Sequence, residues 1–220
     1  MFTDSLNRVV NYKTAYMPPP AFEFFVMNTN LEAIEATPFT LTVKTLGSVV
    51  PEDVQIVYND EVYIMNQKEL GVFQYEFSQP KTSIDFKLQA AEVVSKPYRI
   101  NVLATPVLLS FDMFLDYPSY TGKADKKITN NGNATIPEGT QLKWKLLTKS
   151  TDTVSFASKN SLSYFERDGH KFQFTNQFFE TSNYTIQTSN SKLKNYENLA
   201  FSLQVIKDQS PAIKVEMKQD

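Results

Sequence analysis

Residues 39–44 read FTLTVK, and residues 140–145 read TQLKWK. In each stretch apolar and polar residues alternate, so an extended chain would present one apolar face and one polar face. Leu41 and Val43 occupy the positions that Leu142 and Trp144 occupy in the second stretch. The alternation predicts two half-buried β-strands at equivalent places in two copies of one fold.

The match between the two halves continues from these stretches onward, at a spacing of roughly 100 residues. The matched stretches are VQIVY with VSFAS, EVYI with SLSY, YEFSQ with FQFTN, DFKLQA with NYTIQT, RINV with SLQV, and Pro106-VLLSFDM with Pro211-AIKVEM. The paired inward residues are Val54 with Val154, Ile56 with Phe156, Phe86 with Tyr184 and Leu88 with Ile186. Short alternating strands between turn residues, repeated at this length, are typical of one sandwich fold. The sequence predicts an all-β protein of two tandem immunoglobulin-like antiparallel β-sandwiches.

The repeat also predicts the domain boundaries. We expect an N-terminal segment with a proline linker at residues 1–20, a first sandwich at 21–105 and a second at 106–210. Residues 211–220 would be a linker or the first strand of a third unit, or else a last edge strand of the second sandwich with an edge open to strand addition. Because the strand before Pro106 runs directly into the next one, we expect a stiff joint.

Composition excludes several classes of function. The chain has 24 acidic and 22 basic residues and a net charge of −2, so it has no cationic excess for nucleic acid or for an anionic membrane surface. It has no cysteine, which excludes disulfides, thiolate metal sites and cysteine nucleophiles. It has no apolar run long enough to span a bilayer. We therefore expect no nucleic-acid partner and no direct membrane insertion by this segment.

The stretch DYPSYTGK, residues 116–123, contains a Gly-Lys pair that invites comparison with a phosphate-binding loop. Such a loop needs a Gly five residues before Gly-Lys, a Ser or Thr after it, and a helix to follow. Tyr117 and Ala124 occupy those two positions, and no helical pattern follows. The spacing instead predicts a strand that ends at Pro118 and a turn at Gly122, followed by a hairpin in ITNNGNATIP with a type I′ turn at Asn131-Gly132.

No other pattern predicts catalysis or a cofactor. His170 is the only histidine and lies beside Asp168-Gly169, which predicts a β-turn on a solvated tip. Four acidic residues, Asp112, Asp116, Asp125 and Glu138, are close in sequence, but they lack the spacing of a calcium loop. No pair of carboxylates stands out as a glycosidase pair. We expect no enzyme activity, no metal and no cofactor.

Aromatic residues leave carbohydrate binding open, because sugar-binding sandwiches present exposed Trp and Tyr rings. Trp144 is in register with Val43, which predicts a core position for it. The better candidates for exposure are Tyr63, Tyr117, Tyr120 and Tyr196, which form no evident row. Two N-glycosylation sequons, at Asn133 and Asn183, would matter only in a eukaryotic secretory setting.

The stretch FLDYPSYTGK, followed by NNGNATIPEGTQLKWKL, resembles a family of large membrane-anchored Bacteroidetes envelope proteins that contain a domain of unknown function. Proteins of that family contain segments of the form YP-x-YTGK and IPEGT. LNRVVNY, PPPAFEFFVMN and FTLTVKTLGSVVPEDVQI also resemble that family, so the likeness covers nearly the whole chain. Asp125-Lys126 departs from it where an acidic residue is expected after the lysine. The resemblance implies a periplasmic or cell-envelope location, transmembrane helices before this segment, and no catalytic residues.

These observations predict a non-catalytic structural or protein-interaction segment of a larger cell-envelope protein. Its partners would be other domains of the same full-length chain or other envelope proteins. The alternative is a carbohydrate-binding or accessory module of a polysaccharide-processing system. The second sandwich has YTGK where the first has NTNLEAIEAT, so we expect any partner or interdomain surface in that stretch, and its candidate residues are Asp116, Tyr117, Tyr120, Thr121 and Lys123.

Overall fold

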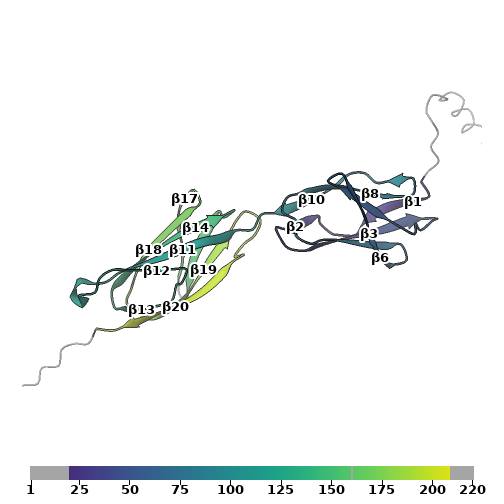
Figure 1. Ribbon diagram of the computed structural model, residues 1–220. Helices are drawn as coiled ribbons and strands as arrows, with labels where there is room; N and C mark the ends of the chain where they lie inside the picture. The colour runs from purple at the N-terminus through teal and green to yellow at the C-terminus, as the bar shows by residue number, and fades with distance from the viewer. Residues whose placement is uncertain (1–19, 160, 209–220) are drawn as a thin grey trace, which may run out of the picture. The chain divides into compact units, whose positions relative to one another are not determined.

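The computed structural model of this chain describes residues 20–159 and 161–208, and these residues form β-strands and one short 3-10 turn (Figure 1). The chain divides into two compact units, unit 1 (Met1–Val102) and unit 2 (Leu103–Asp220). The expected N-terminal segment, apart from Pro20, and the expected strand at 211–220 lie outside the described residues. Among the described residues, none belongs to a helix with the length and apolar composition that crossing a bilayer requires.

Unit 1 is a sandwich of two sheets. The first sheet has the strand order β1 (Phe22–Val26), β3 (Phe39–Gly47), β7 (Val72–Phe77) and β6 (Asn66–Glu69). The second has the order β2 (Glu32–Ile34), β10 (Tyr98–Leu103), β8 (Ile84–Ala90), β4 (Gln55–Tyr58) and β5 (Glu61–Ile64), with β9 (Val93–Val94) beside β8. The chain crosses repeatedly between the two sheets, and the apolar faces of both sheets meet in one core.

Unit 2 has the same plan. Its first sheet has the order β12 (Lys126–Thr129), β11 (Val107–Asp116), β14 (Thr140–Lys149), β18 (Lys171–Phe178) and β17 (Glu166–Asp168). Its second sheet has the order β13 (Ala134–Pro137), β20 (Asn198–Ile206), β19 (Ser182–Ser189), β15 (Thr153–Ser158) and β16 (Ser161–Tyr164). The 3-10 turn η1 (Ser119–Thr121) lies between β11 and β12.

The strand orders of the two units coincide once β9 and β12 are set aside. Strand β1 corresponds to β11, β3 to β14 and β7 to β18, while β10, β8 and β4 correspond to β20, β19 and β15. One difference from a wholly antiparallel sandwich is that β13 pairs with β20 in parallel. Two packed sheets with this division of strands confirm the predicted class, and both units are immunoglobulin-like β-sandwiches.

The inward residues of the repeat form the two cores. Leu41, Val43, Val54, Ile56, Phe86 and Leu88 are buried in unit 1, and their counterparts Leu142, Trp144, Val154, Phe156, Tyr184 and Ile186 are buried in unit 2. Trp144 is fully buried, which confirms its predicted core position. Its ring packs against Phe156, Phe178 and Tyr184, and its indole N–H donates to the Tyr184 hydroxyl at 3.2 Å.

The predicted hairpin at ITNNGNATIP is wrong. Strand β12 pairs with β11 in the first sheet, whereas β13 pairs with β20 in the second, so the chain changes sheets between residues 129 and 134. Asn130, at φ 53°, makes the first bend, and its amide oxygen accepts from the Phe111 N–H at 3.0 Å. Alternating stretches on either side of an Asn-Gly pair occur both in hairpins and where a chain changes sheets. The local sequence pattern could therefore not distinguish the two arrangements.

Close packing in the core, and not a type I′ turn, requires glycine at residue 132. Its φ is not in the left-handed region, and a Cβ at this position would lie 2.5 Å from the Tyr184 hydroxyl and 2.6 Å from Cγ of Phe201. Its carbonyl accepts from the Tyr184 hydroxyl at 2.8 Å. Burial raises the pKa of Tyr184, so its hydroxyl keeps the proton that it donates here.

Candidate functional site

The YTGK turn, which we define as residues 116–123, is a tight cap on the end of β11. Strand β11 ends before Pro118. The Pro118 carbonyl accepts two hydrogen bonds from Thr121, one from its backbone N–H at 3.0 Å and one from its hydroxyl at 2.8 Å. Gly122 follows at φ 61°, a left-handed conformation that glycine adopts without strain. The Lys123 N–H then donates to the Thr121 hydroxyl at 3.3 Å. The segment is therefore a hydrogen-bonded turn between two strands.

The two tyrosines of this turn have different environments. Tyr117 is half-buried and packs against the core of unit 2, and the Lys123 ammonium lies 5.7 Å from the centre of its ring. The Tyr120 ring is 60% exposed, and its hydroxyl donates to the Glu138 carbonyl at 2.8 Å. The YTGK turn thus contacts the IPEGT segment (residues 136–140), although 18 residues separate Tyr120 from Glu138.

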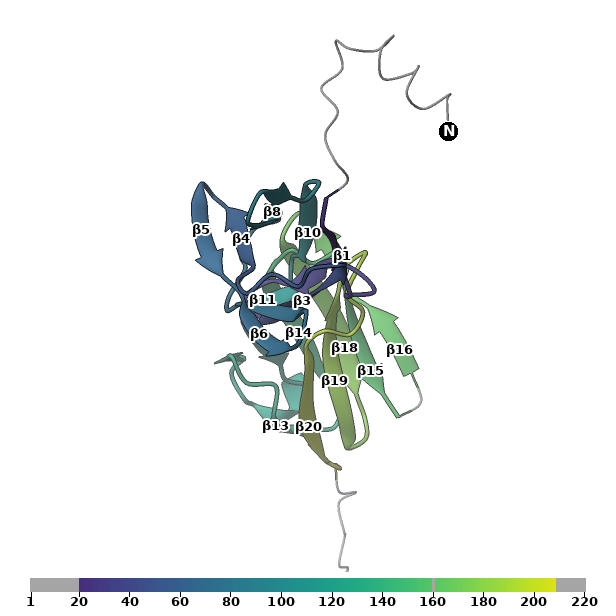
Figure 2. The same cartoon turned by 90° about the vertical axis from the view of Figure 1, so that its right-hand side faces the viewer.

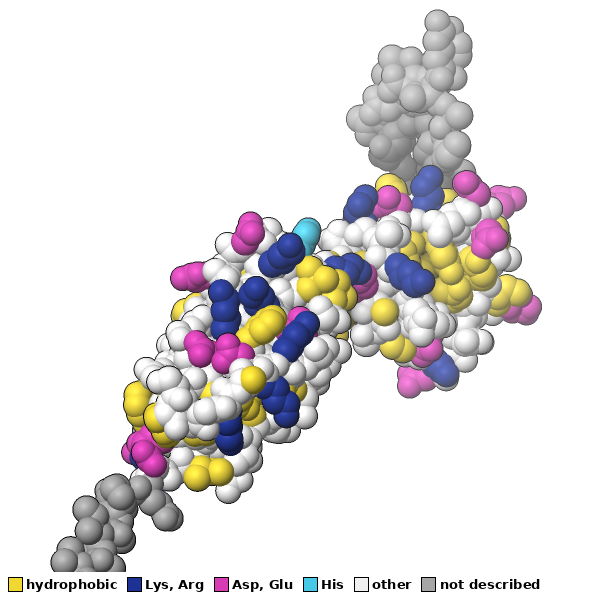
Figure 3. All heavy atoms as spheres, turned by 60° about the vertical axis from the view of Figure 1, so that its left-hand side comes forward, with side chains coloured by type: hydrophobic (Ala, Val, Ile, Leu, Met, Phe, Trp, Pro, Cys, Tyr) yellow, Lys and Arg dark blue, Asp and Glu magenta, His cyan; other side chains and the backbone are white. Residues whose placement is uncertain are grey.

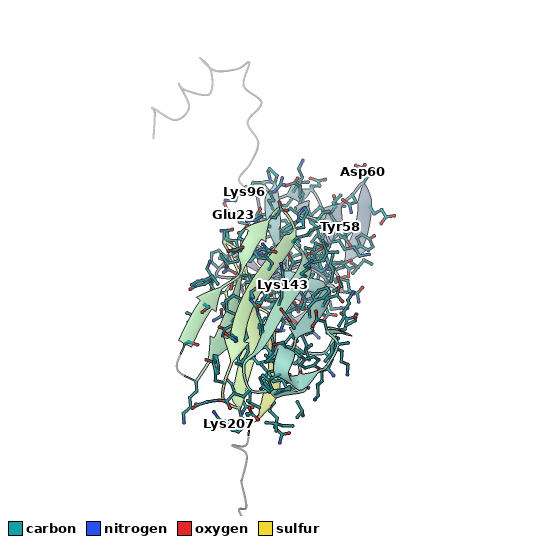
Figure 4. All side chains as sticks on the ribbon, turned by 90° about the vertical axis from the view of Figure 1, so that its left-hand side faces the viewer. Glu23, Tyr58, Asp60, Lys96, Lys143 and Lys207 are labelled. Carbon is teal, nitrogen blue, oxygen red and sulfur yellow. The ribbon has the colours of Figure 1, made fainter. Side chains whose placement is uncertain are left out.

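Glu138 connects this cap to the end of the last described strand. Its backbone N–H donates to the Ile206 carbonyl at 2.9 Å, and its carboxylate accepts from the Lys207 ammonium at 3.0 Å and from the Asp208 N–H at 3.3 Å. Figure 4 labels Lys207 at this end of β20. These contacts, with Tyr120, form what we name the exit anchor. The hydrogen bond from Lys207, followed by the one from the Asp208 N–H, lowers the pKa of the Glu138 carboxyl.

The YTGK turn lies at the end of unit 2 opposite to Val107, because the ten residues of β11 separate it from the connection to unit 1. The structure brings Tyr117, Tyr120, Thr121 and Lys123 together there, and Asp116 is the exposed last residue of β11. The expectation of a partner or interdomain surface in this segment stays a prediction. Its register along β11 places it beside the residues at which the described chain leaves unit 2.

The opposite end of unit 2 holds the connecting residues through two buried polar side chains. The Asn190 amide donates to the Ala104 carbonyl at 2.8 Å and to the Ser150 carbonyl at 3.1 Å. The Thr188 hydroxyl donates to the Pro106 carbonyl at 2.6 Å. Asn190 is also the centre of its own loop, since its amide oxygen accepts from the N–H groups of residues 192 and 193. We name these contacts the linker clamp.

Sequence reasoning missed both the linker clamp and the exit anchor. Buried polar side chains such as Thr188 and Asn190 carry no periodic signal, and their partners are more than 80 residues away in sequence. A weak signal was available for the exit anchor, because the YTGK and IPEGT segments both belong to the resemblance described above. Nothing in either segment alone indicated that they touch.

Residues of the types that serve catalysis and metal binding have ordinary surface surroundings here. His170 is exposed in the turn between β17 and β18, next to Gly169 at φ 60°, which confirms the predicted turn. Asp112 pairs with the Lys127 ammonium at 2.9 Å, and that hydrogen bond is the main cause of its lowered pKa. Within residues 20–159 and 161–208, no three His, Cys, Asp or Glu side chains converge closely enough to hold a metal ion.

Unit 1 contains a tyrosine cluster that the sequence indicated only in part. Tyr58 and Tyr63, from the β4–β5 hairpin, stack with ring centres 4.8 Å apart, and the Tyr58 hydroxyl lies 2.9 Å from that of Tyr75 on β7. Tyr63 also donates to the Glu61 carboxylate, and this hydrogen bond is the main cause of its raised pKa. Tyr63 is half-buried rather than a free platform, because its ring is covered by Tyr58.

Acidification tests the exit anchor. Because the pKa of Glu138 is lower in the folded chain than in the unfolded one, its ionised form stabilises unit 2 at neutral pH, and that stability is lost as the pH falls through the folded pKa. We expect Glu138→Gln to lower the melting temperature of unit 2 by a few degrees at pH 7. The fluorescence of Trp144, the only tryptophan, follows unit 2 selectively.

The melting temperatures of the wild type and of Glu138→Gln should converge at pH values well below 4.5, the ordinary pKa of a Glu side chain. The wild-type carboxyl is also neutral there. Glu166→Gln is the matched control, since Glu166 is exposed on β17, at the far edge of the first sheet. A difference between Glu138→Gln and wild type that persists unchanged at low pH would show that the carboxylate charge is not the cause.

Comparison with protein-family models and with curated proteins finds no match to this chain. Solved structures of tandem domains are similar to it. A chimeric titin Z1Z2 tandem is 10% identical, with 86% of this chain and 100% of that chain covered and a TM-score of 0.34. Rst D1-D2 is 10% identical, with 84% and 100% covered and a TM-score of 0.39. The fibronectin(III)-like modules of Clostridium thermocellum CbhA are 9% identical, with 88% and 100% covered and a TM-score of 0.34. These likenesses carry no argument about function.

Proposed function

We propose that this chain is a non-catalytic spacer and interaction segment of a larger bacterial cell-envelope protein, with both of its units in the periplasm or on the cell envelope. Its partners would be other domains of the same full-length protein or other envelope proteins. The support for the location and for the bacterial setting is the resemblance carried by the YTGK and IPEGT segments.

The observation that carries the spacer role is the linker clamp. Strand β10 ends at Leu103 and β11 begins at Val107, so three residues connect them. The carbonyls of two of these three, Ala104 and Pro106, accept hydrogen bonds from buried side chains of unit 2. A linker whose backbone groups are bonded to one of the domains has little freedom to bend, because each bend would break one of these hydrogen bonds.

The exit anchor gives unit 2 a similar hold on the residues that follow β20. Glu138 bonds residues 206, 207 and 208, and Tyr120 supports Glu138. Unit 2 therefore fixes the chain where it enters and where it leaves the sandwich. A domain that binds the chain at both of its ends is suited to keeping neighbouring domains at a set separation. The interaction surfaces of those domains would then be presented at fixed positions.

Asn190→Ala tests this role. We expect the variant to release Ala104 and so to broaden the distribution of distances between unit 1 and unit 2. The distances are measured by electron spin resonance between labels on Lys87→Cys and Thr175→Cys, two exposed strand positions in units 1 and 2. Asn101→Ala is the matched control, because Asn101 is exposed on β10 and lies three residues before Ala104. Equal widths for Asn190→Ala and wild type would reject the clamp as the source of stiffness.

A further inference from the structure

The second sheet of unit 2 contains no charged residue. All 31 residues of β13, β20, β19, β15 and β16 are uncharged, in a chain in which 21% of residues are charged. The first sheet of the same unit has 11 charged residues in its strands. A solvent-facing sheet normally carries charges on its outer face, which keep it soluble and discourage association. The absence therefore calls for a functional explanation.

The first sheet of unit 2 shows the ordinary arrangement. Lysines from β12 and β14 surround Phe114, and the ammonium groups of Lys127 and Lys145 lie 5.6 and 5.1 Å from the centre of its ring. Figure 4 labels Lys143 on this face, and dark-blue Lys and Arg side chains gather over it in Figure 3. In unit 1, the sheet that corresponds to the uncharged one carries Asp85 and Arg99 as an exposed ion pair. The uncharged face is thus peculiar to one sheet of unit 2.

The outer face of the uncharged sheet has regular rows of uncharged side chains, one largely polar and the next largely apolar. The strands of this sheet lie in the order β13, β20, β19, β15 and β16, and Figure 2 shows β19, β15 and β16 side by side. One row across the sheet consists of Tyr164, Ser155, Gln187 and Asn198. The Gln187 amide donates to the Asn198 amide oxygen at 3.3 Å. The next row consists of Leu162, Ala157, Thr185 and Ala200, so the middle of the face is flat.

A shallow hollow of about 720 Å³ lies on this face over β15, β19 and β20. Its hydrogen-bonding lining includes the side chains of Asn183, Thr185 and Ser202, and two alanines, Ala157 and Ala200, contribute apolar surface. Lys159, in the turn after β15, is the charged residue that lines it. Tyr164, 63% exposed on the edge strand β16, lies on the same face of the sheet.

The chemistry of the face selects among ligands. An acidic polymer or a nucleic acid would require several cations, and the hollow has one. A second protein sheet would require large apolar side chains at the centre of the contact, whereas the centre here consists of Ala and Thr. Amide and hydroxyl side chains offer both donors and acceptors, which suits a ligand covered with hydroxyl groups. Flat apolar patches and an exposed Tyr ring suit the C–H faces of sugar rings.

We infer that this face, over β15, β19 and β20, binds an uncharged polysaccharide. Amides and hydroxyls of the hollow would pair with the sugar hydroxyls, Ala157 and Ala200 would contact the flat faces of the rings, and Tyr164 would stack on a ring at the edge of the sheet. The charge-free face matches a charge-free ligand and avoids the cost of burying an unpaired ion. This inference goes beyond the spacer role and does not depend on it.

Affinity electrophoresis tests the inference with defined probes. The native gels contain hydroxyethylcellulose, xyloglucan, galactomannan or soluble starch, with polygalacturonate as the acidic comparison. We expect at least one neutral polysaccharide to retard the wild-type chain and polygalacturonate not to retard it. Ala200→Lys, which places an ammonium at the centre of the face, should weaken that binding by about tenfold or more. Gln141→Lys, the same change of charge on an exposed position of β14, should leave it unchanged.

Ser202→Lys, on the same face of β20, repeats the test if Ala200→Lys fails to fold, and circular dichroism with thermal melting establishes folding in each case. The inference is overturned if no neutral polysaccharide retards the wild type, if only polygalacturonate does, or if both lysine variants bind as the wild type does. It is also overturned if sedimentation shows a wild-type dimer that Ala200→Lys dissociates, because the face would then be covered by a second copy of the chain.

Discussion

Trp144→Ala should destabilise unit 2 by about 3–5 kcal/mol and leave unit 1 folded. The Trp144 side chain is fully buried at the centre of an aromatic cluster, and its removal would leave a cavity against Phe156, Phe178 and Tyr184. The indole N–H also donates to the Tyr184 hydroxyl, which the substitution leaves with one buried partner fewer. The loss is a large share of the stability of a domain of this size.

Hydrogen exchange read out by mass spectrometry separates the two units for this variant. We expect faster exchange in β14, β18, β15 and β19 and unchanged exchange in β3, β7, β4 and β8. Val43→Ala is the matched control, since Val43 occupies the position of Trp144 in unit 1, and its effect should appear in unit 1 alone. If either substitution accelerated exchange equally in both units, the two cores could not be independent.

Gly132→Ala should destabilise unit 2 by about 1–3 kcal/mol, because the added Cβ would overlap two core side chains. The nearest atoms would be the Tyr184 hydroxyl at 2.5 Å and Cγ of Phe201 at 2.6 Å, and both belong to rings that are packed in the core of unit 2. Moving Tyr184 aside would also lengthen its hydrogen bonds to the Gly132 carbonyl and to Trp144. Urea unfolding followed by Trp144 fluorescence measures the change in the free energy of unfolding.

Gly122→Ala provides the comparison for Gly132→Ala. Gly122 has a positive φ but no atom within 4 Å of a built Cβ, so its substitution adds backbone strain alone. We expect a cost of about 1 kcal/mol there. A Gly132→Ala variant as stable as the wild type would show that contact with Tyr184 and Phe201 is not what requires glycine at residue 132.

The cores were predictable from the sequence because burial in a sandwich leaves a period of two in the chain. Val43 and Trp144 differ in size and shape, yet the repeat assigned both to the inside, and both are fully buried. The repeat strengthened each assignment, since a residue could be compared with its counterpart in the other unit. Turn residues helped where the geometry is local, as at Gly169 between β17 and β18.

What the sequence could not predict depends on contacts between distant segments. The change of sheet after Asn130 is decided by hydrogen bonds to Phe111 and by the fit of Gly132 against Tyr184. The linker clamp joins Asn190 to Ala104 across 86 residues. The absence of charge in β15, β19 and β20 is visible in the printed sequence, but only the strand order shows that these segments form one face.

The central proposal is that unit 2, through its hydrogen bonds to the Ala104 and Pro106 carbonyls, restricts bending between the units. The most direct test is the distance distribution between spin labels on Lys87→Cys and Thr175→Cys in the otherwise wild-type chain, in which the absence of native cysteine makes the labelling specific. The account predicts one narrow distribution that does not change with temperature or with moderate salt. A broad distribution, as expected for a freely hinged pair, would contradict it.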